Sequence, residues 1–167
     1  AGVYSDNDGN GGDFGNFTNL TISASGNFGG LIYGIRVVNN NYISNNNISN
    51  LVCVGQDSTG IRVSSNNTMQ GNTLNSISGT NVNGIDFAGD NNVVQNSQIA
   101  DVTGTMAYGL WIASSNNNIT DTNISGSSSA DVFTIPPGTS TGNIFLNVTY
   151  TTEDINSGDD ITRKWYY

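Results

Sequence analysis

The sequence contains no histidine, which removes the commonest general base and the commonest transition-metal ligand. Its one cysteine, Cys53, cannot form a disulfide within the chain. Two prolines are too few for a polyproline or collagen-like structure. No apolar run is long enough to span a bilayer, so we expect no membrane insertion.

Positive charge is also scarce. Four Lys and Arg residues stand against 13 Asp and Glu residues, which gives a formal net charge of −9. Nucleic acids and anionic lipids select basic surfaces, so we expect neither as a partner. The chain opens at Ala1 without a methionine, as a mature exported protein would, and we expect an extracellular or cell-surface location.

A repeat rich in small polar residues runs through the chain, of which Asn, Ser, Thr and Gly make up half. Each copy has a glycine, an alternating apolar pair and two adjacent asparagines further on. The opening glycines lie 26, 24 and 25 residues apart, and a period of this length indicates a solenoid. They are Gly34, Gly60, Gly84 and Gly109.

Apolar residues at i and i+2, such as Ile61 and Val63, show the alternation of a β-strand. Each copy has three short apolar segments, which are stable only when coils stack. The sequence therefore predicts an all-β, parallel β-helix of roughly five to six coils without significant helix, right-handed by the crossover rule. The expected inner row is Ile35, Ile61, Ile85 and Leu110.

We divide the chain into a loop-rich N-terminal coil or cap (1–33), the β-helix repeats (34–150) and a C-terminal strand or tail (151–167). The repeat glycines are expected where the backbone turns into the first strand of each coil. Stacked asparagines are expected to form hydrogen-bonded ladders along the rod. One ladder is Asn41, Asn67, Asn92 and Asn117, and a weaker one is Asn46, Asn72, Ser97 and Thr122.

The pattern Gly-Ile-x-Val-x-x-x-Asn-Asn-x-Ile-x-x-Asn-x-Ile resembles the right-handed parallel β-helix repeat. It is similar to carbohydrate-binding and sugar-hydrolase β-helix domains, to the copper-processing NosD family and to Asn-rich repeats of archaeal surface-layer and sheath proteins. The resemblance covers 34–126 well. It implies a fold and leaves the function open, because this scaffold hosts lyases, hydrolases, adhesins and shells.

One outward row carries the charged and aromatic residues that the repeat otherwise lacks. It is interpreted either as a surface ion pair between Arg62 and Asp86 with an exposed aromatic, or as a sugar-contact row. The β-helix hydrolases that the fold resembles need clustered Asp and a His, so we expect no enzyme and no catalytic residue. The row consists of Arg36, Arg62, Asp86 and Trp111.

Three further site hypotheses concern the surface. Asp6, Asp8 and Asp13 lie in a Gly-rich segment that suggests a weak structural calcium site, and we expect no other metal or cofactor. Cys53 is either buried or an interchain staple. Asn-x-Ser/Thr sequons are candidate glycan sites, although several would lie in a ladder where a glycan cannot fit. They begin at Asn16, Asn19, Asn47, Asn66, Asn118, Asn123 and Asn147.

The sequence favours a structural function, as a self-assembling subunit of a cell-surface layer, sheath or filament. Its expected partner is a further copy of itself, bound through open strand edges and the aromatic tail of Trp165, Tyr166 and Tyr167. The alternative is a carbohydrate-binding or polysaccharide-cleaving module, with surface glycans as partners.

Overall fold

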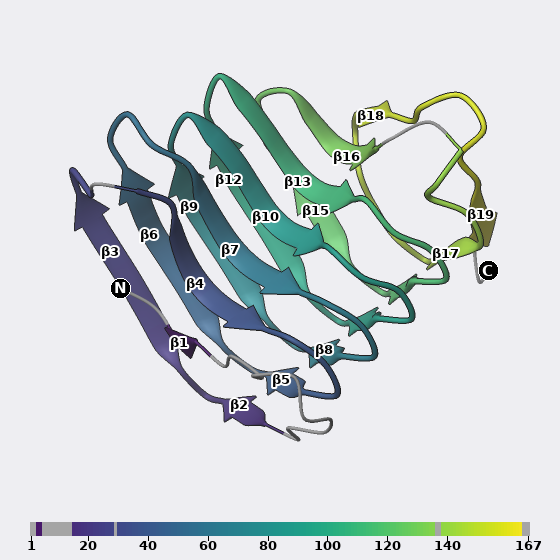
Figure 1. The fold of residues 1–167 in the computed structure, drawn as a ribbon, viewed down its shortest axis with the longest axis horizontal. Coiled ribbons are helices and arrows are strands. Elements are labelled where there is room, and N and C mark those ends of the chain that lie inside the picture. Colours follow the sequence, from purple (N-terminus) through teal and green to yellow (C-terminus); the bar gives the residue numbers. More distant parts are fainter. Residues whose placement is uncertain (1–2, 5–14, 29, 136–137, 165–167) are drawn as a thin grey trace.

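The computed structural model describes residues 3–4, 15–28, 30–135 and 138–164. Within these ranges the chain forms a parallel β-solenoid of about five turns with no helix. Successive coils lie side by side from the N-terminal to the C-terminal end (Figure 1). The predicted all-β parallel solenoid with three faces is confirmed, and the described residues contain no helix.

The strands form three sheets, and every strand pair is parallel. Coils up to β15 contribute one strand to each sheet, whereas β16 to β19 add strands to sheets A and B alone. Sheet A contains β1 (Val3–Tyr4), β4 (Ile32–Val37), β7 (Ser58–Val63), β10 (Asn81–Phe87), β13 (Met106–Ile112), β16 (Ala130–Thr134) and β18 (Glu153–Asp154). Sheet B contains β2 (Asn16–Thr18), β5 (Tyr42–Ser44), β8 (Thr68–Gln70), β11 (Val93–Gln95), β14 (Asn118–Thr120), β17 (Asn143–Leu146) and β19 (Ile161–Lys164). Sheet C contains β3 (Thr21–Gly26), β6 (Asn47–Cys53), β9 (Thr73–Ser78), β12 (Gln98–Thr103) and β15 (Asn123–Ser125).

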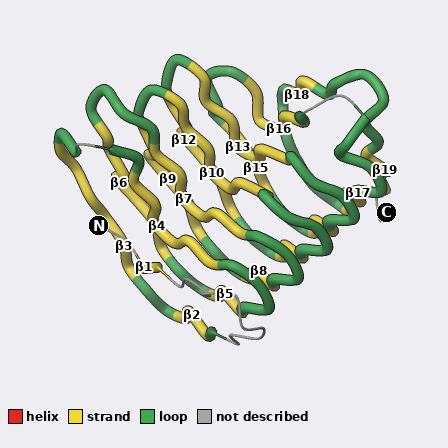
Figure 2. Tube along the Cα trace, viewed as in Figure 1, coloured by secondary structure: helices red, strands yellow, loops and turns green. Residues whose placement is uncertain are grey.

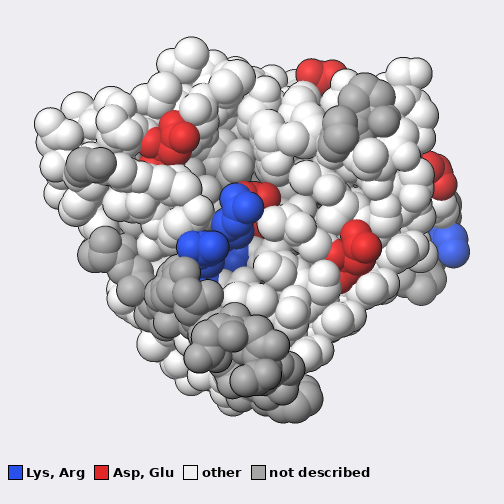
Figure 3. Space-filling model, in the orientation of Figure 1, with Lys and Arg blue, Asp and Glu red and all other residues white. Residues whose placement is uncertain are grey.

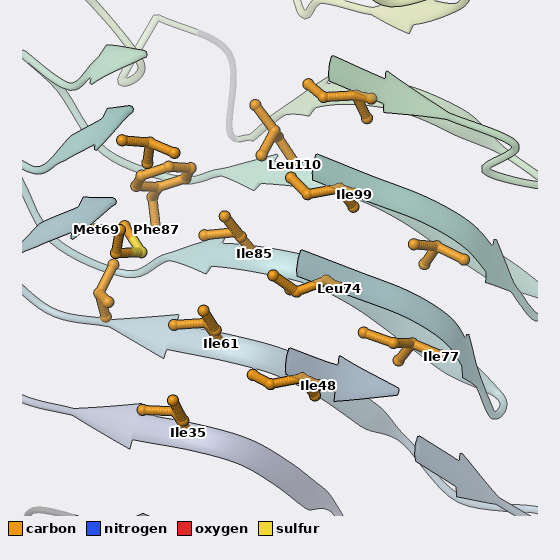
Figure 4. Close-up of a cluster of buried hydrophobic side chains, with 14 of the residues drawn as sticks. Ile35, Ile48, Ile61, Met69, Leu74, Ile77, Ile85, Phe87, Ile99 and Leu110 are labelled. Carbon is orange, nitrogen blue, oxygen red and sulfur yellow. The ribbon is translucent and has the colours of Figure 1, made fainter. Parts of the chain in front are cut away.

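The core is a set of apolar rows inside the three sheets. The predicted row in sheet A is in register from Ile35 through Ile61 and Ile85 to Leu110, and each of these residues is fully buried. Ile48, Leu74 and Ile99 form a second row from sheet C (Figure 4). Because each side chain packs on its equivalent one coil away, a continuous core forms from strands too short to be stable alone.

The adjacent asparagines at the corners have two different roles. The corner between sheets A and B places the first of each pair, such as Asn91, in the left-handed region, with φ of 61°. Asparagine tolerates this region better than most residues, and Gly142 takes the same place in a later coil. The strands are therefore short segments separated by tight corners (Figure 2).

The second asparagine of each pair points inward and forms the predicted ladder. The Asn92 side-chain oxygen accepts from the Asn67 backbone N–H (2.9 Å) and from Asn67 Nδ2 (3.1 Å). Asn92 Nδ2 donates to Asn117 Oδ1 (3.1 Å), and the row runs on to Asn143, one coil further than predicted. The second ladder weakens after Asn72, whose backbone N–H donates to the Ser97 hydroxyl at 3.3 Å.

The repeat glycines do not lie at turns, and that prediction is wrong. Each lies inside a sheet A strand and faces the core, where its backbone approaches the next coil. A Cβ on Gly84 would lie 2.5 Å from the Gly109 carbonyl oxygen and 2.6 Å from Ile99 Cγ2. Glycine is required there because the coils come too close for any side chain.

Replacing Gly84 by alanine is expected to lower the free energy of unfolding by about 1–3 kcal/mol, the usual cost of overpacking a core. The added methyl group meets backbone, which cannot rotate away. Gly30→Ala is the matched control, because its added Cβ would have no atom within 4 Å. Denaturant unfolding of both variants measures the difference, and equal midpoints would contradict the role of the glycine row.

The glycine row ends at Asp131, which takes the corresponding place in β16. Its buried carboxylate accepts from the backbone N–H groups of Ser127 (3.2 Å), Thr151 (2.9 Å) and Thr152 (3.3 Å). These amides lie in irregular chain that has no complete strand partner, so the side chain supplies their hydrogen bonds. Asp131 thus marks the change from regular coils to the final turn.

Candidate binding cleft on sheet A

The outer face of sheet A carries two rows of side chains because of the glycines. In each middle strand the glycine and the residue after it both face inward, as Gly84 and Ile85 do. The residue before the glycine and the second residue after it therefore face outward. In β10 these are Asn83 and Asp86, and strand register places them beside Tyr108 and Trp111 of β13.

A cleft of about 250 Å³ lies on this face, across strands β7, β10 and β13. Its lining combines an ion pair, two amides, two aromatic rings and one flexible apolar side chain. The lining residues are Arg62, Asn81, Asn83, Asp86, Met106, Tyr108 and Trp111.

An ion pair forms one side of the cleft. Arg62 Nη1 donates to Asp86 Oδ2 at 2.6 Å, and the Arg62 side chain is 39% exposed whereas that of Asp86 is 6% exposed. Asp86 Oδ1 accepts no hydrogen bond from any described residue. The pair therefore presents a carboxylate acceptor and further guanidinium donors at one place. Basic and acidic atoms adjoin near the middle of the face in Figure 3.

Burial raises the pKa of the Asp86 carboxyl above its ordinary value of 3.8, although the charge of Arg62 and its hydrogen bond oppose the change. Desolvation disfavours the charged form of a buried acid, and here it outweighs the single partner. The folded protein is consequently less stable with Asp86 ionised than with Asp86 protonated. Perturbed pKa values cluster at sites that act on a ligand, and structural ion pairs also produce them.

Packed aromatic rings form the other side. The Tyr108 and Trp111 ring centroids are 5.1 Å apart, and Phe133 lies 4.3 Å from Tyr108 and 4.8 Å from Trp111. Phe133 does not line the cleft, so it supports the two rings that do. Met106, also in the lining, is 47% exposed.

The predicted outward row is in register as expected, from Arg36 through Arg62 and Asp86 to Trp111. The cleft brings the last three together and leaves out Arg36, whose guanidinium lies 5.4 Å from the ring centroid of Tyr33.

The sequence interpretation missed Asn81, Asn83, Met106 and Tyr108. The available signal was the residue before each repeat glycine, which includes Asn83 and Tyr108. In a regular strand, that residue and the second residue after the glycine would lie on opposite faces, because they are three residues apart. Here the glycine and the residue after it both face inward, so the residues on either side of them share the outer face.

The sequons lie on the surface and none lies in a buried ladder, so that expectation is wrong. Asn118 is half-buried and the other six sequon asparagines are exposed. The reason is the strand period: a ladder asparagine faces inward, so the residue two places on also faces inward and is apolar, as Ile43 is after Asn41. A Ser or Thr is therefore excluded at that place.

The remaining predicted sites lie elsewhere. Cys53 is 1% exposed, which fits the buried alternative and leaves no thiol for an interchain bond. The calcium candidates Asp6, Asp8 and Asp13 and the aromatic tail 165–167 lie outside the described residues. Within the described ranges, no group of three or more His, Cys, Asp or Glu could hold a metal ion.

Comparison with family models, curated proteins and solved structures finds no match to this chain. The structure supports the resemblance at the level of the parallel β-solenoid fold. A relation to the copper-processing family, to surface-layer proteins or to archaeal proteins stays a prediction. No helix in the part of the chain that the structure describes has the length and hydropathy needed to cross a bilayer.

Proposed function

We propose that this protein binds carbohydrate in the cleft on sheet A. The observation that carries the proposal is the open carboxylate oxygen of Asp86, held by Arg62 beside the rings of Tyr108 and Trp111. Sugars present hydroxyl groups at their edges and C–H groups on their faces. Paired donors and acceptors beside aromatic rings complement both kinds of surface.

The proposed activity is recognition without cleavage. Glycoside hydrolysis ordinarily uses two carboxyl groups on either side of the scissile bond. Asp86 is the one carboxylate among the described residues that line the cleft. The raised pKa of Asp86 would suit an acid, but its lining neighbours supply no second group as base or nucleophile.

Replacing Trp111 by alanine is expected to weaken saccharide binding about tenfold, since an aromatic contact contributes roughly 0.5–1.5 kcal/mol beyond the area it buries. A glycan array, followed by titration calorimetry with its best ligand, provides the measurement. Tyr42→Ala is the matched control, because Tyr42 is an exposed aromatic of sheet B outside the cleft. Failure of the unmodified protein to bind any saccharide would refute the proposal.

A structural role at the cell surface is the second candidate, and an open sheet edge favours it. Among the described residues, β3 pairs with β6 on one side and has no strand on the other. Such an edge offers unpaired N–H and C=O groups to a further copy of the chain.

Self-assembly through that edge or the tail is expected to appear as a rise in sedimentation coefficient with concentration. A chain shortened after Lys164 keeps β19 and loses only 165–167, so it separates the contribution of the tail from damage to the last coil. Unchanged assembly would show that the tail is not the connector. A monomer at all concentrations would exclude the structural role.

A further inference from the structure

We infer that the cleft selects a neutral saccharide, bound through two adjacent hydroxyl groups, over sugars that carry a carboxylate or sulfate. This inference rests on the proposed function and names its ligand class. It follows from the charge balance of the cleft, from its unused hydrogen-bonding groups and from its size.

The charges that line the cleft cancel. Arg62 is the one basic residue among the described lining residues, and Asp86 already neutralises it at 2.6 Å. An anionic sugar that approached Arg62 would also meet the buried Asp86 carboxylate, and two carboxylates in one site disfavour each other. The chain as a whole carries a net charge of −9, which adds a longer-range repulsion.

The free hydrogen-bonding groups match a pair of hydroxyls. A hydroxyl group both donates and accepts, so one sugar hydroxyl can donate to Asp86 Oδ1 while its neighbour accepts from the Arg62 guanidinium. A carboxylate or sulfate only accepts, and it would leave Asp86 Oδ1 without a donor. Such a loss is costly because the Asp86 side chain is only 6% exposed.

Two asparagine side chains add further hydrogen-bonding groups to the cleft. The side chains of Asn81 and Asn83 line the cleft, and neither makes a hydrogen bond to a described residue. Each offers one acceptor and two donors. Half-buried amides without protein partners are suited to further sugar hydroxyls. They offer no charge with which to hold an anion.

The size of the cleft limits the ligand. Pockets for small molecules usually measure about 300–1,000 Å³, and this one measures about 250 Å³. The recognised unit is therefore one sugar residue, or the end of a chain, seated between the ion pair and the rings of Tyr108 and Trp111.

Three matched pairs of methyl glycosides test the inference, because the members of each pair differ only at C6: glucose and glucuronate, galactose and galacturonate, mannose and mannuronate. Binding to the whole chain is followed by saturation-transfer NMR and by calorimetry at low and high salt. We expect at least one neutral glycoside to bind at least tenfold more tightly than its uronate, with little dependence on salt. The Asp86→Asn variant should narrow that difference, because it removes the repelling charge.

Asp121→Asn is the matched control, since Asp121 is exposed at a corner where other coils carry asparagine. It should leave the preference unchanged. A uronate that binds more tightly than its neutral partner, with an affinity that falls as salt rises, would overturn the inference and leave carbohydrate binding intact. Failure of all six glycosides and of the glycan array would overturn both.

Discussion

Replacing Asn92 by leucine is expected to lower the free energy of unfolding by about 4 kcal/mol, because each buried polar group left without a partner costs roughly 1–3 kcal/mol. Leucine has nearly the same size, so little cavity forms. The change removes the acceptor of the Asn67 backbone N–H and the donor to the Gly89 carbonyl oxygen (2.6 Å), at a fully buried position. Domains of this kind are stable by about 5–15 kcal/mol, so a large share of the stability would be lost.

The neighbouring asparagine provides the control for that experiment. Asn91 is adjacent in sequence, but its role is to adopt a φ of 61° at an exposed corner. Glycine adopts that conformation freely and already takes the equivalent place as Gly142, so Asn91→Gly should change stability by less than about 1 kcal/mol. Thermal melts followed by circular dichroism compare the two. Similar losses from both variants would mean that the ladder does not stabilise the coils.

Replacing Asp86 by asparagine is expected to weaken saccharide binding at least tenfold while leaving the folded state as stable as before, or more stable, at pH 7. The pKa of Asp86 is raised in the folded state, so folding favours its protonated form. The contribution of Asp86 to the free energy of unfolding is therefore most favourable below pH 3.8, and it falls as the pH rises through the raised pKa. Asparagine does not ionise, so the variant does not lose this stability at neutral pH. The Arg62 side chain is 39% exposed, so its charge stays in contact with water without the ion pair.

Unfolding measured from pH 3 to pH 8 tests this sign. The difference in stability between Asp86→Asn and the unmodified chain should be smallest in acid and should grow in favour of the variant toward neutral pH. A variant that is markedly less stable at neutral pH would show that the ion pair is a structural element, which is the first of the two interpretations that the sequence allowed for this row.

The fold could be predicted from the sequence because one residue pattern repeats along the chain. The spacing of Gly34, Gly60, Gly84 and Gly109, the apolar alternation and the paired asparagines all depend on nearest-neighbour coils. The ion pair between Arg62 and Asp86 followed from the same register. The role of the glycines could not be read in this way, since a glycine is equally consistent with a turn and with close backbone contact.

The cleft was harder to predict because it depends on a departure from the pattern. Alternation alone places Asn83 and Asp86 on opposite faces, since they are three residues apart. They share a face because Gly84 and Ile85 both face inward, and nothing in the composition distinguishes that geometry from a regular strand. Phe133, which packs behind the rings, belongs to a copy in which Asp131 takes the place of the repeat glycine, so the glycine spacing does not mark it.

The restriction of contacts to adjacent coils also bears on how such a chain can change in evolution. A coil is a unit of 24 to 26 residues that begins and ends at equivalent places, so a duplication in the gene inserts a complete layer. The cleft depends on β7, β10 and β13, and Asp131 with its three amides closes the coils beyond them. Duplication between Gly34 and Gly60 would thus lengthen the rod and leave both intact, so that length and ligand can be selected independently.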